Sequence, residues 1–168
     1  MPKSLRPIFC DRNDFSAGHS LTEQTVAALM ASEFLIVICS PKAARSKYVN
    51  EEIRQFKAMG RSDRIIPLII DGEPNDAERE CFPPALRFRI GSDGELTNVR
   101  EEPIAADARA QGDGRELAKL KVVAGLIGLP LDEVVRRAER ARKRGTGFGS
   151  ALHAAFCFFL RPHSSYGS

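Results

Sequence analysis

The feature that most constrains this 168-residue chain is an unbroken apolar run at residues 34–39, Phe-Leu-Ile-Val-Ile-Cys. A strand with one solvated face alternates apolar and polar residues, whereas a strand covered by helices on both faces is apolar throughout. The run is too short to cross a membrane as a helix, which needs about 20 apolar residues. It therefore predicts a central strand of a parallel sheet, and the most buried of its strands.

A turn and a helix are expected directly after this strand. Ser40 and Pro41 stop the strand, because Ser favours caps and turns and Pro lacks the N–H that a ladder needs. The spacing then predicts an amphipathic helix over residues 46–59. Its apolar side is predicted to hold Tyr48, Val49, Ile53, Phe56 and Met59. Its polar side is predicted to hold Asn50, Arg54 and Lys57.

Glu52 is out of place on this helix, because it falls within the apolar stripe, whereas Glu51 lies outside it. A carboxylate on an inward face needs a cationic partner, a raised pKa or a function. Glu52 also follows the carboxyl end of the predicted central strand, where open α/β sheets build their ligand sites. Two interpretations stay open at this point: a structural ion pair with a nearby Lys or Arg, and a functional carboxylate.

The remaining pattern alternates strands with helices. Further strands are predicted at residues 5–10, 64–70 and 86–90, and further helices at 20–31, 113–128 and 132–144. Pro67 favours an edge position or a bulge for the strand at 64–70, and residues 92–112 are expected to form a turn and then mostly loop. This order predicts an α/β, flavodoxin-like three-layer fold with a parallel sheet.

Composition excludes several classes of protein. The chain has 25 Lys and Arg against 22 Asp and Glu, a net charge of +3, so no nucleic-acid partner is expected. No G-x-G-x-x-G or Walker motif supports a Rossmann or P-loop nucleotide site. No signal peptide and no membrane span are predicted. The four cysteines have no C-x-x-C spacing and are expected to be reduced thiols of a cytoplasmic protein, without a metal site: Cys10, Cys39, Cys81 and Cys157.

Four segments in a fixed order carry a family resemblance: PIFCDRNDFSAGHSL, ASEFLIVICSP, SKYVNEEI and RIIPLIIDGEP. Together they resemble a bacterial-type TIR (Toll/interleukin receptor) domain over about residues 2–144. The resemblance starts at the family's second strand and the BB loop that follows it. We therefore expect an N-terminally truncated TIR-like domain at residues 1–144, lacking the family's first strand and helix. Residues 145–168 fit no family pattern and are expected to form a disordered tail.

The resemblance implies a function in signalling or defence. Many TIR proteins cleave the nicotinamide–ribose bond of NAD⁺ with a Glu on the helix after the central strand, and Glu52 matches that position. By the same resemblance, Arg12 and Asp14 lie in the BB loop beside the nucleotide pocket, although solvated loop charges are the alternative. Ser40 is a further substrate-binding candidate, with a helix cap as its alternative. Tyr48 replaces the Trp that the family usually carries and completes the candidate set.

Two functions of different class follow. In the first, the chain is an NAD⁺ hydrolase that uses NAD⁺ as a substrate and needs no cofactor, since one carboxylate suffices to stabilise the cation formed as nicotinamide leaves. In the second, it is a non-catalytic TIR module that associates with other TIR domains, and homo-oligomers are expected on activation. The position of Glu52 favours the first, and the expected lack of the first strand favours the second.

Overall fold

The computed structural model describes residues 21–91 and 93–143, and the statements that follow concern these residues. The chain divides into two compact units, Met1–Ala118 and Lys119–Ser168. Three predictions lie outside the described residues: the strand at 5–10, the loop that carries Arg12 and Asp14, and the tail at 145–168. They stay predictions.

The first unit contains a parallel sheet with the strand order β1–β2–β5. Its strands are β1 (Leu35–Cys39), β2 (Ile65–Ile69) and β5 (Ala106–Asp107). Strand β1 pairs with β2 along its whole length, whereas β5 pairs with β2 only at Leu68↔Ala106 and Ile69↔Asp107. The predicted α/β fold with a parallel sheet is therefore confirmed.

Strand β2, rather than β1, is the more buried of the two long strands. Its last three residues are buried, whereas only Val37 and Cys39 are buried in β1. The prediction that residues 34–39 form the most buried strand is therefore wrong for the part of the chain that the structure describes. The physical reason is that β2 has described neighbours along both of its edges, and β1 has one.

Pro67 lies inside β2 and pairs with Val37 without a register shift, so the predicted edge or bulge is wrong. Backbone groups of alternate residues in a parallel strand face alternate neighbours. The Ile70 N–H donates towards β1, whereas the Ile69 carbonyl accepts a bond on the β5 side. Pro67 has the parity of Ile69, so its nitrogen faces the β5 side. Pairing with β5 begins only at Leu68, and the missing N–H therefore leaves no ladder bond unmade.

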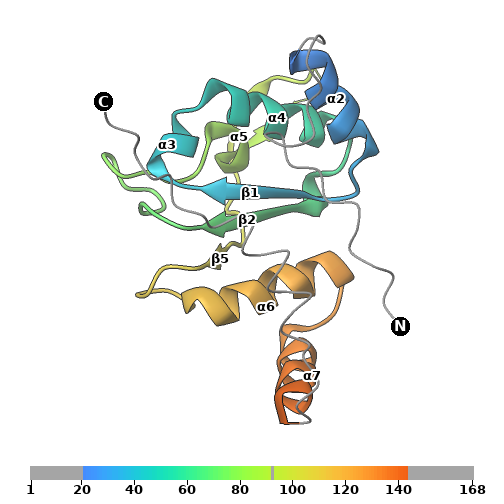
Figure 1. The fold of residues 1–168 in the computed structure, drawn as a ribbon. Helices are drawn as coiled ribbons and strands as arrows, with labels where there is room; N and C mark the ends of the chain where they lie inside the picture. The colour runs from blue at the N-terminus through green and yellow to red at the C-terminus, as the bar shows by residue number, and fades with distance from the viewer. Residues whose placement is uncertain (1–20, 92, 144–168) are drawn as a thin grey trace, which may run out of the picture. The chain divides into compact units, whose positions relative to one another are not determined.

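Helices of the first unit cover one face of this sheet (Figure 1). They are α2 (Leu21–Ala31), α3 (Pro41–Ala44), α4 (Lys47–Ala58) and α5 (Pro84–Arg87), with a 3₁₀ turn, η1, at Ser62–Arg64. The core packs side chains of these helices against the strands and includes Val37, Cys39, Ile53, Ile69, Cys81, Phe82, Ala85 and Leu86. Burial of this apolar surface is the main force that holds the helices on the sheet.

An antiparallel hairpin follows α5, formed by β3 (Phe88–Ile90) and β4 (Leu96–Arg100). The expected strand at 86–90 is therefore shorter, because Pro84 begins a helical turn that includes residues 86 and 87. Strands β4 and β5 lie where mostly loop was expected. The last three residues of β4 are exposed, so the alternation that reveals a strand is weak there.

The buried face of α4 differs from the predicted stripe. Tyr48, expected to face inward, is 77% exposed, whereas Lys57, expected to face outward, is 8% exposed. Helix α5 and the β3–β4 hairpin pack on the side that the pattern predicts to be polar. There the side-chain oxygen Oδ1 of Asn50 accepts a bond from Ala85 N at 2.8 Å, and Lys57 Nζ donates to Phe88 O at 3.2 Å.

The buried ammonium of Lys57 also pairs with Glu101 Oε2 at 2.5 Å, and the side chain of Glu101 is only 32% exposed. The hydrogen bond from Lys57 holds the pKa of Glu101 below its usual range. A carboxyl whose pKa is depressed on folding contributes stability above its unfolded pKa of about 4.3, and that contribution is lost as the pH falls.

We expect Glu101→Gln to lower the free energy of unfolding at pH 7 by about 1–3 kcal/mol, because it leaves a buried ammonium without its counter-charge. Urea unfolding of both proteins at pH 7 and at pH 3 measures this. The difference between wild type and variant should shrink at pH 3, where Glu101 takes up a proton. An equal difference at the two pH values would contradict the prediction.

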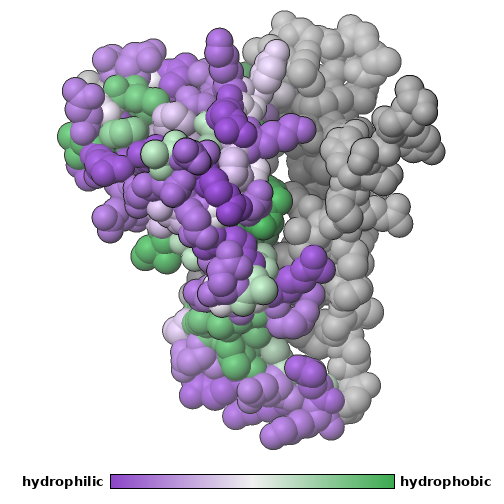
Figure 2. Space-filling model, turned by 90° about the vertical axis from the view of Figure 1, so that its left-hand side faces the viewer, coloured by the Kyte–Doolittle hydropathy of each residue, from purple (hydrophilic) through white to green (hydrophobic). Residues whose placement is uncertain are grey.

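The second unit begins within α6 (Gly114–Ile127) and continues through α7 (Leu131–Lys143), so the two predicted C-terminal helices are confirmed. Arg136 and Arg137 form ion pairs one turn back along α7, with Asp132 and Glu133 respectively. Hydrophilic side chains gather over α7 at the lower end of the view in Figure 2. None of the helices described in 21–91 and 93–143 is long and apolar enough to cross a membrane.

Candidate functional site

Glu52 lies in the second turn of α4, the helix that follows the carboxyl end of β1. The helix begins at a capping serine, since Ser46 Oγ accepts a hydrogen bond from Val49 N at 3.3 Å. Helix α4 contacts both β1 and α3. Glu52 is half-buried, and Phe56, one turn further on, is fully buried. The side chain therefore lies at the margin of the packed face, rather than at its centre.

Ser40 ends β1 and caps α3, because its Oγ accepts a hydrogen bond from Ala43 N at 3.2 Å. Pro41 follows as the first residue of the helix, where its missing N–H is not needed. The capping interpretation of Ser40 is therefore confirmed, and its contact with a substrate stays a prediction. The cap places the Ser40 hydroxyl at the carboxyl end of the sheet.

Tyr48 lies in the first turn of α4, four residues before Glu52. Residues four apart are neighbours on a helix surface. The exposed ring of Tyr48 and the half-buried carboxylate of Glu52 therefore belong to one side of the helix. The prediction that Tyr48 belongs to the inward stripe beside Glu52 is wrong, because its ring is exposed, whereas Glu52 is half-buried.

Glu51, adjacent to Glu52, belongs to a different network. Its carboxylate accepts bonds from Arg54 at 2.7 and 2.8 Å and from Gln55 at 2.8 Å. The hydrogen bond from Arg54 is the main reason why the pKa of Glu51 is lowered. Arg54 continues to Gly94 O at 2.5 Å in the β3–β4 turn. Glu51 is therefore a structural acid that ties α4 to the hairpin.

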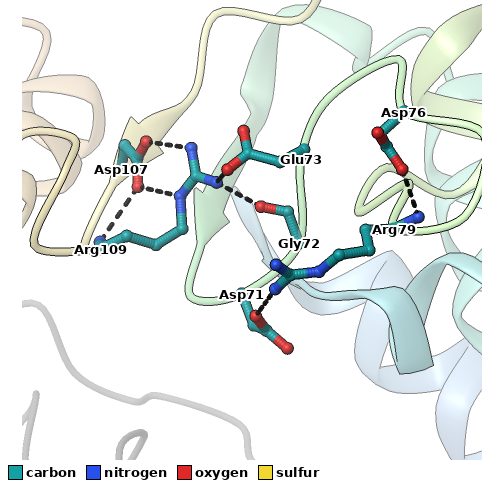
Figure 3. Close-up of polar contacts among 7 residues, drawn as sticks. All are labelled: Asp71, Gly72, Glu73, Asp76, Arg79, Asp107 and Arg109. Atoms are coloured by element: carbon teal, nitrogen blue, oxygen red, sulfur yellow. Dashed lines mark hydrogen bonds and ion pairs between the residues drawn. The ribbon is translucent and has the colours of Figure 1, made fainter.

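A polar cluster at the carboxyl ends of β2 and β5 was missed by the sequence patterns (Figure 3). The guanidinium of Arg109 binds the carboxylate of Asp107 at 2.7 and 2.9 Å and that of Glu73 at 2.6 Å, and it donates to Gly72 O. The signal available in the sequence was an acidic turn directly after an apolar strand, Asp71-Gly72-Glu73. Arg109 already pairs with two acids and a backbone carbonyl, so the cluster links β5 to the turn that follows β2.

A pocket of about 220 Å³ lies at the C-terminal end of α4, where Lys57, Gly60 and Ser62 face Arg89 and Gly91 of the hairpin. Tyr48 lies at the opposite end of the same helix. This pocket is therefore separate from the candidate site around Ser40, Tyr48 and Glu52.

The sequence of this chain is similar to known proteins. The family model described as TIR domain matches residues 3–102, a range that includes every candidate residue named above except those of the Arg109 cluster beyond it. The NAD(+) hydrolase ApTIR of Actinoplanes sp. is 30% identical over 166 residues, which cover 85% of this chain and 22% of that protein. The chain thus spans less than a quarter of the length of this relative. No solved structure gave a significant match.

Proposed function

This chain belongs to the TIR domain family, and on that premise we propose that it hydrolyses the nicotinamide–ribose bond of NAD⁺, in signalling or defence, with Glu52 as the catalytic carboxylate. The observation that carries the proposal is the half-buried position of Glu52 on α4, just beyond the carboxyl end of β1. Similarity to a protein named as an NAD(+) hydrolase supports it. NAD⁺ is a substrate here, and no cofactor or metal is part of the proposal.

The chemistry requires little more than one placed negative charge. As the bond breaks, nicotinamide leaves with the bonding electron pair, and positive charge develops on the ribosyl carbon and ring oxygen. A carboxylate at this point stabilises the cation, and its effect is stronger where protein partly excludes water. Water then adds to the ribosyl carbon and releases a proton to the solvent. In this proposal Glu52 acts in the first step.

Substrate contacts are proposed for four further residues. The exposed ring of Tyr48 offers a stacking surface for a heteroaromatic base. The Ser40 hydroxyl accepts a backbone bond and still carries an O–H donor that suits a ribose oxygen. Arg12 and Asp14 are proposed to bind phosphate and ribose, and lie outside the described residues.

The test is nicotinamide release by the purified chain over a range of protein concentrations. We expect release to rise more steeply than in proportion to concentration, because we propose that the chain acts as a homo-oligomer through contacts between TIR domains. Light scattering on the same samples reports association. Association without any nicotinamide release would overturn the hydrolase proposal and favour a non-catalytic TIR module.

A further inference from the structure

The two-residue pairing of β5 with β2 is reinforced by side chains. Glu73 follows β2 and Asp107 ends β5, so two carboxylates meet at the same edge of the sheet. Like charges that meet at short range must be compensated. The compensating cation is Arg109, whose side chain is only 11% exposed (Figure 3).

All three nitrogens of the Arg109 guanidinium bind oxygen atoms. Its Nε and Nη2 bind the carboxylate of Asp107 in a bidentate pair, while its Nη1 reaches Glu73 Oε1 and Gly72 O. The hydrogen bonds that Arg109 donates to Asp107 and then to Glu73 raise its pKa above the usual value, so it stays charged. A lysine cannot reproduce this arrangement, because its ammonium is a single point charge.

We call the contacts of Arg109 with Asp107, Glu73 and Gly72 the clamp. Through Gly72 the clamp contacts the start of α3, which Ser40 caps. Gly72 has a φ of +87°, and a Cβ placed there would lie 2.6 Å from Arg79 O and 2.8 Å from Pro41 Cδ. The backbone of Gly72 therefore packs directly against Pro41, the residue after Ser40. A displacement of Gly72 would therefore shift Pro41 and, with it, the Ser40 cap of α3.

The chain that follows Gly72 contacts α4 further on. Glu73 N donates to Arg79 O at 2.8 Å, and the chain then enters the core at Cys81 and Phe82. It continues into α5, where Ala85 N donates to Asn50 Oδ1 on α4, two residues before Glu52. We name residues 72–85 the edge segment. It contacts both elements that carry the candidate site.

We propose that Arg109 is a positioning residue for NAD⁺ cleavage: by clamping the edge segment to β5, it sets the placement of Ser40 and Glu52 through Pro41 and Asn50. This inference rests on the proposed function. It assigns a role to a residue beyond the range, 3–102, that the family model matches.

The test compares two arginines of the same region. Arg109→Lys keeps the positive charge and removes the fork, so we expect kcat/KM for NAD⁺ to fall roughly 10- to 100-fold, as small misplacements of reacting groups do. Arg79→Lys is the matched control, since Arg79 lies within the edge segment and pairs with Asp71 at 2.8 Å, with both side chains more than half exposed. We expect the control to leave kcat/KM within about twofold, because an exposed ion pair contributes little.

A double-mutant cycle separates positioning from general stability. If Arg109 acts through Ser40, Arg109→Lys should lower kcat/KM for NAD⁺ by a smaller factor in a Ser40→Ala background than in the wild type. An equal loss of kcat/KM in the two backgrounds would overturn the proposal that Arg109 acts through Ser40. Circular dichroism monitors folding throughout. If Arg109→Lys does not fold, Glu73→Gln replaces it in the cycle, because it weakens the same clamp and leaves the bidentate pair with Asp107 in place.

Hydrogen exchange tests the clamp independently of activity. The amides of Glu73 and Ala108 donate to Arg79 O and Ile69 O, both at 2.8 Å, and report on the edge segment and on β5. They should exchange faster in Arg109→Lys and unchanged in Arg79→Lys. Unchanged exchange in Arg109→Lys would overturn the clamp. Faster exchange in a chain whose wild type releases no nicotinamide would support the clamp as a structural contact, and it would overturn the proposed function together with the role of Arg109 in NAD⁺ cleavage.

Discussion

Glu52→Gln is expected to reduce nicotinamide release by roughly 100-fold or more, the range seen when a group that stabilises transition-state charge is removed. The substitution preserves the shape of a half-buried side chain on α4 and deletes its negative charge. It should therefore slow the cleavage step. Steady-state release of nicotinamide, measured by chromatography at matched protein concentration, gives the ratio.

The chain offers a matched control one residue away. Glu51→Gln makes the same chemical change at a carboxylate that accepts hydrogen bonds from Arg54 and Gln55. Loss of this partly exposed pair should cost at most about 1 kcal/mol of stability and leave most of the activity. Comparable losses of activity in both variants, or an active Glu52→Gln protein, would rule out Glu52 as the catalytic carboxylate.

Phe56→Ala is expected to lower the free energy of unfolding by about 3–5 kcal/mol, because it removes a large ring and leaves a cavity. Phe56 is fully buried on α4, with the guanidinium of Arg61 5.7 Å from its ring centre. A loss of this size is a large part of the total stability of a domain. Urea denaturation followed by circular dichroism measures the change.

Tyr48→Ala is the control for this experiment, because it truncates another aromatic ring of the same helix. The ring of Tyr48 is exposed, so its loss should change stability by no more than about 0.5 kcal/mol. The stripe predicted from the sequence places both rings in the core. Similar losses at the two positions would therefore favour that stripe over the observed face of α4.

The sequence predicted the elements whose signals are local. The apolar run of β1 identifies a strand by its own composition, and the helix predicted over residues 46–59 is observed as α4, capped by Ser46 through a bond that spans three residues. Helix α3, capped by Ser40, lies where only a turn was expected. The alternation of strands and helices was enough for the α/β class. Glu52 could be identified as a candidate because helical periodicity places it within an apolar stripe, and the family resemblance points to the same residue.

The sequence by itself determined that a strand, a capping serine and a helix with a misplaced carboxylate follow one another, because propensities and caps act over a few residues. Only the tertiary structure decided which face of α4 is buried, since Lys57 meets Glu101 44 residues later. It also decided that Pro67 fits inside the sheet and that Arg109 clamps Gly72, 37 residues earlier. Contacts between distant residues depend on how all the elements pack together, and a local pattern carries no record of that packing.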